Sequence, residues 1–527
     1  MSIRYVSNSA DNGYALGVDT PGGLTKATAW LTLDYALTNA APGDQIILNG
    51  GAAPAFLIAP AGGLNVYTAA TFFSIAKQLD LIGDNFPTLK RTGAVTRVLN
   101  INIQATVNVQ DVILDGENTA SLSALTISSQ VGRFTVNITG VKAINTPIYS
   151  INSSAALCDL NVRRCNLTSV RGGVKSVALT TGSYIITDSV ITATGIQANE
   201  AAIMTDAGAT GITMFVSDNI VNQTSASNNA HGIRSNNVRG IVQRNRVRTA
   251  GSFVACAGIY IGTNGAILAE KPLVRWNYIT HGCFNGGAAG WGILIGSDGD
   301  GADTANDNQI NRPIVYGNVV VGSYGASTPL LHGIEVGHVV GGNVGFNIVV
   351  GAGIGVLAKR TTGDLYLTGN TLAQPLASTS GCVRTKGAQN VIASGNCILV
   401  TNAAGNYAIL NNSEPTVPAQ DSLNNSFIGN TISAPWQATR VVSSAASSTA
   451  EFMMNDYDLP LGVSGASPFS YNGVNYASLA AWGAAQEATF QNLPAGAADR
   501  EFWNKIGFRP GGRGVLPPSG VAPAWGA

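Results

Sequence analysis

The chain has 527 residues, of which 45% are hydrophobic and only 11% are charged, well below the roughly 25% of an average soluble domain. Its 29 basic and 29 acidic residues cancel, and no cluster of Lys and Arg offers the basic face that a sequence-independent grip on nucleic acid needs. No apolar run approaches the ~18 residues of a membrane span. We therefore expect neither a nucleic-acid partner nor a membrane span.

The N-terminal segment carries the first structural signals. Its opening, MSIRYVSNSADNGYALG, lacks the charged start, apolar stretch and cleavage site of a secretory signal, so we expect a protein that is not exported by that route. Further on, ATAWLTLDYALTNAAPGDQIILNGG combines a helical face of Trp30, Leu33, Ala36 and Leu37 with a following strand. A helix here would cover the open end of a core, and residues 1–94 are predicted to hold this cap and the first coils of the fold.

A short motif then recurs along the middle of the chain. Each copy is one residue, then Gly-Ile, then an alternating continuation, as in HGIRSNN, AGIYIGTNG, WGILIGSDG, HGIEVGH and AGIGVLAKR, which begin at His231, Ala257, Trp291, His332 and Ala352. The alternation has period 2 and glycine punctuates it, which favours strands over the helices of a helical repeat.

A second motif, centred on asparagine, follows each copy of the first. Eight asparagines each have an aliphatic residue two positions later: Asn219, Asn245, Asn277, Asn318, Asn347, Asn370, Asn396 and Asn430. Weaker copies lie upstream at Asp111, Asn137, Asn166 and Ser189, which makes twelve in all. Irregular spacing with two short strand segments per unit is typical of a solenoid with variable loops. We expect the asparagines to stack at one bend as a ladder of side-chain amides.

The repeats resemble the right-handed parallel β-helix proteins of the pectate-lyase-like superfamily, over about residues 95–435. The resemblance implies an all-β fold, a right-handed parallel β-helix solenoid of about twelve coils with an N-terminal capping helix and an irregular C-terminal segment. Residues 436–527 would close it, with a short Ala-rich helix in SYNGVNYASLAAWGAAQEATFQ and an extended tail. Phage tailspike and fibre proteins are the members that this chain resembles most.

The stretch HGIEVGH has two histidines and a glutamate in seven residues. In a continuous strand His332 and His338 would lie about 20 Å apart, too far to share a metal ion, so no metal site is predicted here. With Ile334 and Val336 facing the core, strict alternation places Glu335 outward, on the face opposite the histidines. Glu335 is then either an ordinary exposed residue of a strand or a functional carboxylate.

The outward column through Glu335 supplies the candidate site. It includes Arg234 and Tyr260, which suit an oligosaccharide but also fit a mixed solvent face. The acidic loop GSDGDGADTANDNQINRP, inserted between Asn277 and Asn318, adds Asp298, Asp300, Asp303 and Asp307. Glu335 is predicted as catalytic acid or base with Asp298 or Asp300 as its partner, and Arg234, Tyr260, Asp303 and Asp307 as substrate-binding residues.

The loop is not expected to bind calcium. An EF-hand needs a ligand where Ala302 stands and a Glu where Gln309 stands, and a solvated acidic loop is the alternative. The six cysteines, at positions 158, 165, 256, 283, 382 and 397, form no CxxC pair and are predicted to be buried hydrophobes. No metal or other cofactor is predicted.

Three functions remain open. The first is a phage virion protein of the tailspike or fibre kind that binds a bacterial surface polysaccharide and cleaves it or only holds it. The second is a bacterial polysaccharide lyase or glycoside hydrolase, and the third is a structural β-helix without a ligand. The first implies a virion or extracellular location and contacts with other virion proteins. Outward Met204, Leu294 and Leu410 predict a homotrimer with its chains side by side.

Overall fold

The structure is a computed structural model. It describes residues 2–492 except 52–64, 70, 92–96, 119–122, 129–131, 156, 180–181, 208–211, 225–228, 237, 252–255, 264–270, 284–289, 297–309, 323–329, 375–380, 401–406, 415–419, 434–441, 459–468 and 488–490. The predicted C-terminal tail and the predicted acidic loop therefore lie outside the described residues.

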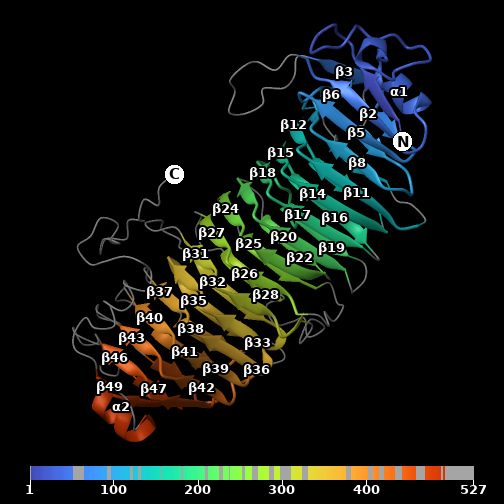
Figure 1. The fold of residues 1–527 in the computed structure, drawn as a ribbon. Helices are drawn as coiled ribbons and strands as arrows, with labels where there is room; N and C mark the ends of the chain where they lie inside the picture. The colour runs from blue at the N-terminus through green and yellow to red at the C-terminus, as the bar shows by residue number, and fades with distance from the viewer. Residues whose placement is uncertain are drawn as a thin grey trace, which may run out of the picture. The chain divides into compact units, whose positions relative to one another are not determined.

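The chain is a parallel β-solenoid of about 11 turns, close to the twelve coils predicted. Its contacts divide it into two compact units, Met1–Ser225 with Ile233–Ile241 and Ala226–Gly232 with Val242–Ala527. Within each unit, successive coils contribute strands to three sheets, here named A, B and C, whose strands pair in parallel except for the last two strands of sheet C. Figure 1 shows these strands lying side by side from coil to coil within each unit. The predicted fold class is confirmed, whereas the predicted boundaries at residues 94/95 and 435/436 stay predictions.

The strands of the first unit fall into three series. Sheet A holds β1 (Ile3–Val6), β2 (Asp44–Asn49), β5 (Leu79–Asp84), β8 (Val107–Gln110), β11 (Phe134–Thr139), β14 (Cys158–Arg163), β17 (Ser183–Thr187) and β20 (Thr213–Ser217). Sheet B holds β3 (Val66–Ala69), β6 (Thr88–Arg91), β9 (Ile113–Asp115), β12 (Lys142–Thr146), β15 (Asn166–Ser169), β18 (Val190–Ala193) and β21 (Ile220–Gln223). Sheet C holds β4 (Phe73–Ile75), β7 (Arg97–Ile101), β10 (Ser123–Ile127), β13 (Tyr149–Ser153), β16 (Gly172–Leu179) and β19 (Ala201–Ala207).

Strands β22 (His231–Asn236) and β23 (Arg239–Gln243) each contain residues of both units, and the remaining strands belong to the second unit. Sheet A there holds β26 (Leu273–Arg275), β29 (Ile310–Asn311), β30 (Ile314–Tyr316), β33 (Val339–Gly345), β36 (Thr362–Thr368), β39 (Val391–Ser394), β42 (Asn425–Ile428) and β45 (Ala450–Met453). Sheet B holds β24 (Arg246–Gly251), β27 (Tyr278–Cys283), β31 (Val319–Val321), β34 (Ile348–Val350), β37 (Thr371–Gln374), β40 (Cys397–Val400), β43 (Thr431–Ser433), β46 (Asp456–Asp458) and β49 (Gln491–Asn492). Sheet C holds β25 (Cys256–Gly262), β28 (Gly290–Gly296), β32 (Leu330–Gly337), β35 (Ala352–Lys359), β38 (Gly381–Lys386), β41 (Tyr407–Asn412), β44 (Val442–Ser444), β47 (Phe469–Tyr471) and β48 (Val474–Tyr476).

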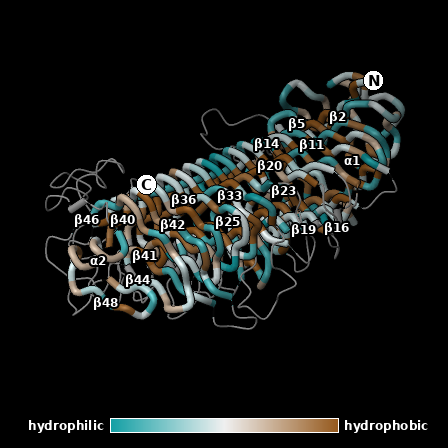
Figure 2. Tube along the Cα trace, turned by 90° about the horizontal axis from the view of Figure 1, so that it is seen from below, coloured by the Kyte–Doolittle hydropathy of each residue, from teal (hydrophilic) through white to brown (hydrophobic). Residues whose placement is uncertain are grey.

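The core of each unit is built from columns of aliphatic side chains. In β11, buried and half-buried residues alternate, as expected of a strand with one face on a core. Figure 2 shows the matching pattern in hydropathy, with hydrophobic and hydrophilic segments alternating along the tube. In the second unit, the aliphatic residues two positions after the asparagines, such as Val320 and Val349, are fully buried.

A left-handed residue followed by a buried asparagine forms the bend between sheets A and B in the second unit. The left-handed residue is glycine in four coils, at Gly317, Gly369, Gly395 and Gly429. From Asn245 to Asn455, the backbone N–H and the Nδ2 of each asparagine donate to the Oδ1 of the asparagine in the next coil, at 2.9–3.0 Å. The predicted stacking is confirmed from Asn245 to Asn430, and we call this array, which extends to Asn455, the asparagine ladder.

The C-terminal helix closes this ladder. Helix α2 (Leu479–Gln486) ends at Glu487, whose Oε1 accepts the N–H and Nδ2 of Asn455 at 2.8 and 2.7 Å. Its Oε2 accepts bonds from the Tyr457 hydroxyl and from Nε1 of Trp482, which is fully buried. The predicted closing helix therefore supplies the acceptor that the last asparagine would otherwise lack.

The predicted N-terminal helix is present in the first unit. Helix α1 (Leu33–Asn39) buries Leu33, Ala36 and Leu37, three of the four residues of the predicted apolar face. Lys77 Nζ donates to the carbonyl oxygens of Thr38 and Ala40 at 2.8 and 2.9 Å, at the C-terminal end of the helix. A single-turn 3₁₀ helix, η1 (Lys26–Thr28), precedes α1.

In the first unit, the upstream copies of the asparagine motif were partly misaligned. Ser189 N–H donates to Asn219 Oδ1 at 3.0 Å, and the N–H of Cys165, not of Asn166, donates to the Ser189 hydroxyl. Asn137 lies in β11 and bonds to a second, outer row of amides with Asn161. These coils use other residues at the bend, so a motif centred on asparagine found the wrong positions.

The cysteine prediction is confirmed where the structure describes the side chains. Among the described residues, five cysteines are buried and form no disulfide: Cys158, Cys165, Cys256, Cys382 and Cys397. The side chain of Cys283 lies outside the described residues.

The ladder predicts a specific stability effect. The side chain of Asn347 accepts two hydrogen bonds from Asn318 and donates to Val315 and Asn370. Asn347→Ala leaves buried donors unpaired and should lower the free energy of unfolding by about 2–4 kcal/mol, measured by chemical denaturation. Asn343→Ala, an exposed asparagine of β33 in the same coil, is the matched control and should change it by less than about 0.5 kcal/mol. Equal effects of the two substitutions would contradict a structural role for the ladder.

Candidate functional site

The alternation of inward and outward side chains breaks at the Gly-Ile pairs of sheet C. A Cβ atom on Gly292 would lie 2.3 Å from a methyl carbon of Val320, and one on Gly333 would lie 2.1 Å from a methyl carbon of Val349. Both contacts are core residues of sheet B, so these glycines face the core, and the isoleucine that follows, Ile334 in the second case, is also fully buried. Two consecutive inward residues place the residues before and after the pair on the same outer side.

This geometry joins His332 to Glu335. His332 Nδ1 lies 2.5 Å from Glu335 Oε2, and Nε1 of Trp291 in the neighbouring strand donates to the same oxygen. The rings of Trp291 and His332 meet edge to face, with centroids 5.9 Å apart. Glu335 is only 2% exposed. Glu335 was predicted to face solvent and to lie on the face opposite His332, and both predictions are wrong. They assume that side chains alternate strictly along the strand, and the core-facing Gly333 interrupts that alternation.

The charges of this cluster favour an ionised carboxylate. Burial raises the pKa of Glu335, but His332, Lys359 and the Trp291 N–H together lower it more, so its pKa lies below the ordinary value. A buried carboxylate that loses such partners would be strongly destabilising. The pair is thus a charged group held out of water by specific partners, an arrangement that is concentrated at functional sites.

His332 is the member of the pair that can reach a ligand. Its side chain is 12% exposed, against 2% for Glu335. An ionised Glu335 accepts a hydrogen bond from an Nδ1–H of His332, so Nε2 is the ring nitrogen left to exchange a proton with a ligand. The arrangement can therefore accept a proton at Nε2, or donate one when the imidazole is protonated, while Glu335 orients the ring.

The outer column of sheet C extends on both sides of this pair. Glu335 is in register with Leu294, which is in register with Tyr260, so Tyr260 lies two strands away, roughly 10 Å. The Tyr260 ring stacks on His231 with centroids 5.0 Å apart. On the other side, the partner of Glu335 is Leu357, followed by Arg384.

The other predicted site residues are not all brought together. Arg234 lies in the first unit, where its guanidinium donates to the carbonyl oxygen of Asn199, whereas Tyr260 and Glu335 belong to the second unit. Asp298, Asp300, Asp303 and Asp307 lie outside the described residues. Their predicted roles stay predictions.

Two of the apolar residues on which the homotrimer prediction rests are buried. Met204 is 6% exposed and Leu294 is 1% exposed, so the chain itself covers these two side chains. They offer no open apolar surface to a second copy, and the homotrimer stays a prediction without this support.

Two residues of the cluster, His332 and Trp291, were not predicted as functional. In the sequence, His332 stands out only as a possible metal ligand paired with His338, and Trp291 only as the first residue of a repeat. The signal that could have found them is the spacing His-Gly-Ile-Glu, because a core-facing glycine followed by isoleucine turns an i, i+3 pair to one side.

Neither helix in the described part of the chain is long and apolar enough to cross a membrane. Over the same residues, no group of three or more His, Cys, Asp and Glu is placed to hold a metal ion. Two open cavities lie away from the cluster, on sheet A of the first and of the second unit.

No family model matches the chain, and no curated protein matches it in sequence. Solved structures resemble it at low identity. The A-module of a mannuronan C-5 epimerase of Azotobacter vinelandii shares 14% identity over 88% of this chain and 93% of its own, with a TM-score of 0.29. Tailspike protein 3 of bacteriophage CBA120 shares 11% over 94% of this chain and 62% of its own, with a TM-score of 0.34. The Dettilon tailspike protein shares 15% over 77% and 68%, also with a TM-score of 0.34. At these values the likeness carries no information on ligands or activity.

The buried pair predicts how stability depends on pH. The folded-state pKa of Glu335 lies below its ordinary value of 4.5. Its contribution is therefore complete above that value and is lost as the pH falls toward the folded pKa. Glu335→Gln keeps an acceptor oxygen but removes the charge, and should lower stability by about 3 kcal/mol near neutral pH. The difference in melting temperature from wild type should shrink as the pH is lowered from about 7 to about 3.

Glu451→Gln is the matched control, because Glu451 is an exposed carboxylate of β45 in the same unit. It should leave the melting temperature close to that of wild type across this range. A Glu335→Gln difference that stays constant with pH would show that the carboxylate is not the titrating partner of His332.

Proposed function

We propose that the second unit binds a polysaccharide of a bacterial surface along the outer side of sheet C and cleaves it with His332 as the proton-transfer group. The observation that carries the proposal is the His332–Glu335 pair, in which a buried carboxylate with a lowered pKa contacts the Nδ1 of a more exposed imidazole at 2.5 Å. Glu335, predicted as the acid or base itself, becomes the positioning residue in this proposal.

The neighbouring side chains suit a carbohydrate. Trp291 closes one side of the pair, and Tyr260 presents a half-buried ring in the same outer column. Aromatic faces and hydrogen-bonding groups are the usual lining of a small-ligand site. Arg384, one register position beyond Leu357, supplies a cation. Its pKa is lowered by burial, while the carboxylates of Glu414 and Glu335 counteract that shift.

Two cleavage reactions fit a single imidazole. As a base, His332 would take the proton beside the carboxylate of an acidic sugar. The electron pair of that C–H bond would form a double bond to the neighbouring carbon while the bond from this carbon to the glycosidic oxygen breaks. The oxygen would leave with the pair of the broken bond and take a proton from water, which gives an unsaturated sugar. As an acid, His332 would protonate the glycosidic oxygen while water attacks the sugar, with Asp298 or Asp300 as the predicted second carboxylate. The product distinguishes a lyase from a hydrolase.

The proposal extends to the setting of the protein. A phage tailspike or fibre-like protein of the virion, assembled as a homotrimer with other virion proteins, would use such a site on the host surface. The composition supports this setting, since 11% charged residues and 63 glycines describe a polar but weakly charged surface.

The test is cleavage of a panel of bacterial polysaccharides. Cleavage is measured from the appearance of new reducing ends and from the ultraviolet absorbance of an unsaturated product. His332→Gln should lower kcat by about 10²-fold or more, because it removes the proton-transfer group. Glu335→Gln should lower kcat and shift the pH profile while KM changes little. Tyr260→Ala should raise KM.

Glu451→Gln again serves as control and should cleave like wild type. Full activity of His332→Gln would refute the assignment of His332. A wild type that cleaves no member of the panel, and whose binding Tyr260→Ala does not weaken, would refute the site as a whole.

A further inference from the structure

Three exposed aromatic side chains follow one another along the end of sheet A in the second unit. Trp276, Tyr316 and Phe346 are 47%, 37% and 57% exposed. The rings of Tyr316 and Phe346 lie 5.3 Å apart, and the guanidinium of Arg275 lies 4.3 Å from the centre of the Trp276 ring. We call these three residues the aromatic ridge.

The fold does not need these rings. Trp276 and Phe346 have φ values of 56° and 55°, in the left-handed region that bulky residues avoid. Glycine makes the same bend at Gly317, Gly369, Gly395 and Gly429, and Arg244 and Met454 make it with large side chains, so the left-handed conformation belongs to the bend itself. Because glycine serves in four coils, the bend does not require an aromatic side chain, and the exposed rings are available for a role beyond folding.

The backbone also displays the rings. A Cβ atom on Gly317 would lie 2.7 Å from the Trp276 ring, and one on Gly369 would lie 3.0 Å from the Phe346 ring. Each ring therefore lies over a glycine of the next coil, and any larger residue there would lift it. The glycines keep the rings low against the sheet.

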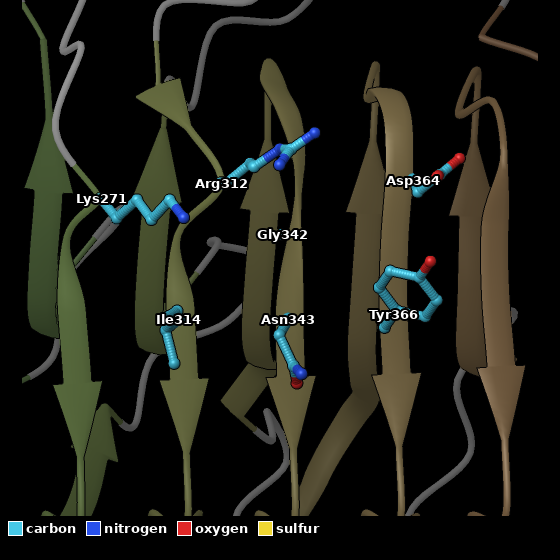
Figure 3. A pocket seen from close by; sticks show the side chains of 7 residues that line it. All are labelled: Lys271, Arg312, Ile314, Gly342, Asn343, Asp364 and Tyr366. Atoms are coloured by element: carbon cyan, nitrogen blue, oxygen red, sulfur yellow. The ribbon is translucent and has the colours of Figure 1, made fainter.

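An open cavity of about 400 Å³ adjoins the ridge on the same face of sheet A. Figure 3 shows Lys271, Arg312 and Asp364 in one row, with Gly342 between the last two, and Ile314, Asn343 and Tyr366 in a second row on the successive strands β30, β33 and β36. Tyr316 lies two residues beyond Ile314 along β30, on the same side of the strand and one step past the second row. The ridge thus begins next to the lining of the cavity.

The cations of this cavity are exposed and available. Among the described residues, no hydrogen bond or ion pair engages the side chain of Lys271 or that of Arg312. Asn343, Asp364 and Tyr366 beside them are exposed too, and they add donors and acceptors. The surface combines flat rings, two unpaired cations and several hydrogen-bonding groups.

We infer that this surface, the aromatic ridge with the cavity of Lys271 and Arg312, is a second carbohydrate-binding site that takes a chain of carboxylate-bearing sugars. The rings would stack on the apolar faces of sugar rings, the two cations would pair with carboxylates, and Asn343 and Asp364 would bond to hydroxyls. The site lies on sheet A and does not depend on the His332–Glu335 pair of sheet C.

The composition of the surface favours a sugar over two other occupants. The centre of an interface with a second copy is depleted of charged residues, whereas the cavity here is lined by two cations and a carboxylate. A single-stranded nucleic acid also stacks on aromatic residues but needs a basic groove that follows its backbone. Asp364 interrupts such a groove, and the chain has a net charge of zero.

The test measures binding to the full chain carrying His332→Gln, so that the probe is not consumed at the other site. The probes are an oligogalacturonate of six sugars and a neutral malto-oligosaccharide of equal length. Calorimetry measures their binding. The ring variant is Trp276→Gly with Phe346→Gly. Glycine is compatible with this bend, because Gly317 and Gly369 occupy the same position in other coils. It should weaken oligogalacturonate binding by about tenfold or more.

The charge variant separates the carboxylate from the rest of the sugar. Lys271→Gln with Arg312→Gln should weaken oligogalacturonate binding by about tenfold or more, because hydrogen bonds to charged groups contribute more free energy than neutral ones. The neutral probe should bind more weakly from the start and be unaffected by this variant. The controls are Met454→Gly, at the same position of another coil and 55% exposed, and Arg248→Gln, an exposed cation of β24. Both should bind like the parent.

Four results would overturn the inference. The first is that the parent binds neither probe. The second is that the ring or charge variants bind oligogalacturonate like the parent. The third is that a single-stranded oligonucleotide binds more tightly than oligogalacturonate and displaces it. The fourth is that light scattering shows the ring variant to dissociate an oligomer while sugar binding is unchanged, which would make the ridge a contact between copies.

Discussion

The hydrogen bonds of the asparagine ladder are the constraint on which the second unit depends. Each asparagine Oδ1 accepts both the backbone N–H and the Nδ2 of the asparagine before it, so a shift of one coil by a single residue would break two bonds at once. Strands with a period of two tolerate no such shift without turning every side chain over. The ladder fixes the register of sheets A and B next to the bend, and Glu487 completes it with a carboxylate in place of the missing next amide. Because the inside is fixed in this way, the outside of the coils can carry chemistry without endangering the fold.

The two surfaces of interest both arise where a local rule is broken. On sheet C, the core-facing Gly333 interrupts alternation and turns His332 and Glu335 to one side, where they form a charged pair that a regular strand would keep apart. On sheet A, the bend position that glycine fills in four coils instead carries the exposed rings of Trp276 and Phe346. Neither departure improves the core, because the aliphatic columns are already buried without them.

The fold could be predicted from the sequence because the ladder repeats one residue type at one bend, with an aliphatic residue two positions later. That signal weakened in the first unit: Ser189 takes the place of asparagine as predicted, but in the coil before it the position belongs to Cys165 and not to the predicted Asn166. The candidate site was harder, because it depends on side-chain direction. Gly355, not Gly353, corresponds to Gly333, since Glu335 pairs with Leu357. An alignment of the Gly-Ile motifs that matches Gly353 with Gly333 is therefore wrong by two residues in that coil.

The exposed and the buried candidates make different physical demands on a ligand. A sugar on sheet A meets rings and cations that are already in water, so binding there loses little desolvation energy and can be broad in specificity. A sugar that reaches His332 must enter beside a carboxylate that is 2% exposed, where low dielectric strengthens every charge interaction and proton transfer is most sensitive to position. Holding and cleaving are thus best served by separate surfaces, an open one that retains the chain and an enclosed one that acts on a single linkage. A rigid solenoid suits this division, because its register fixes both surfaces of the second unit against the same core.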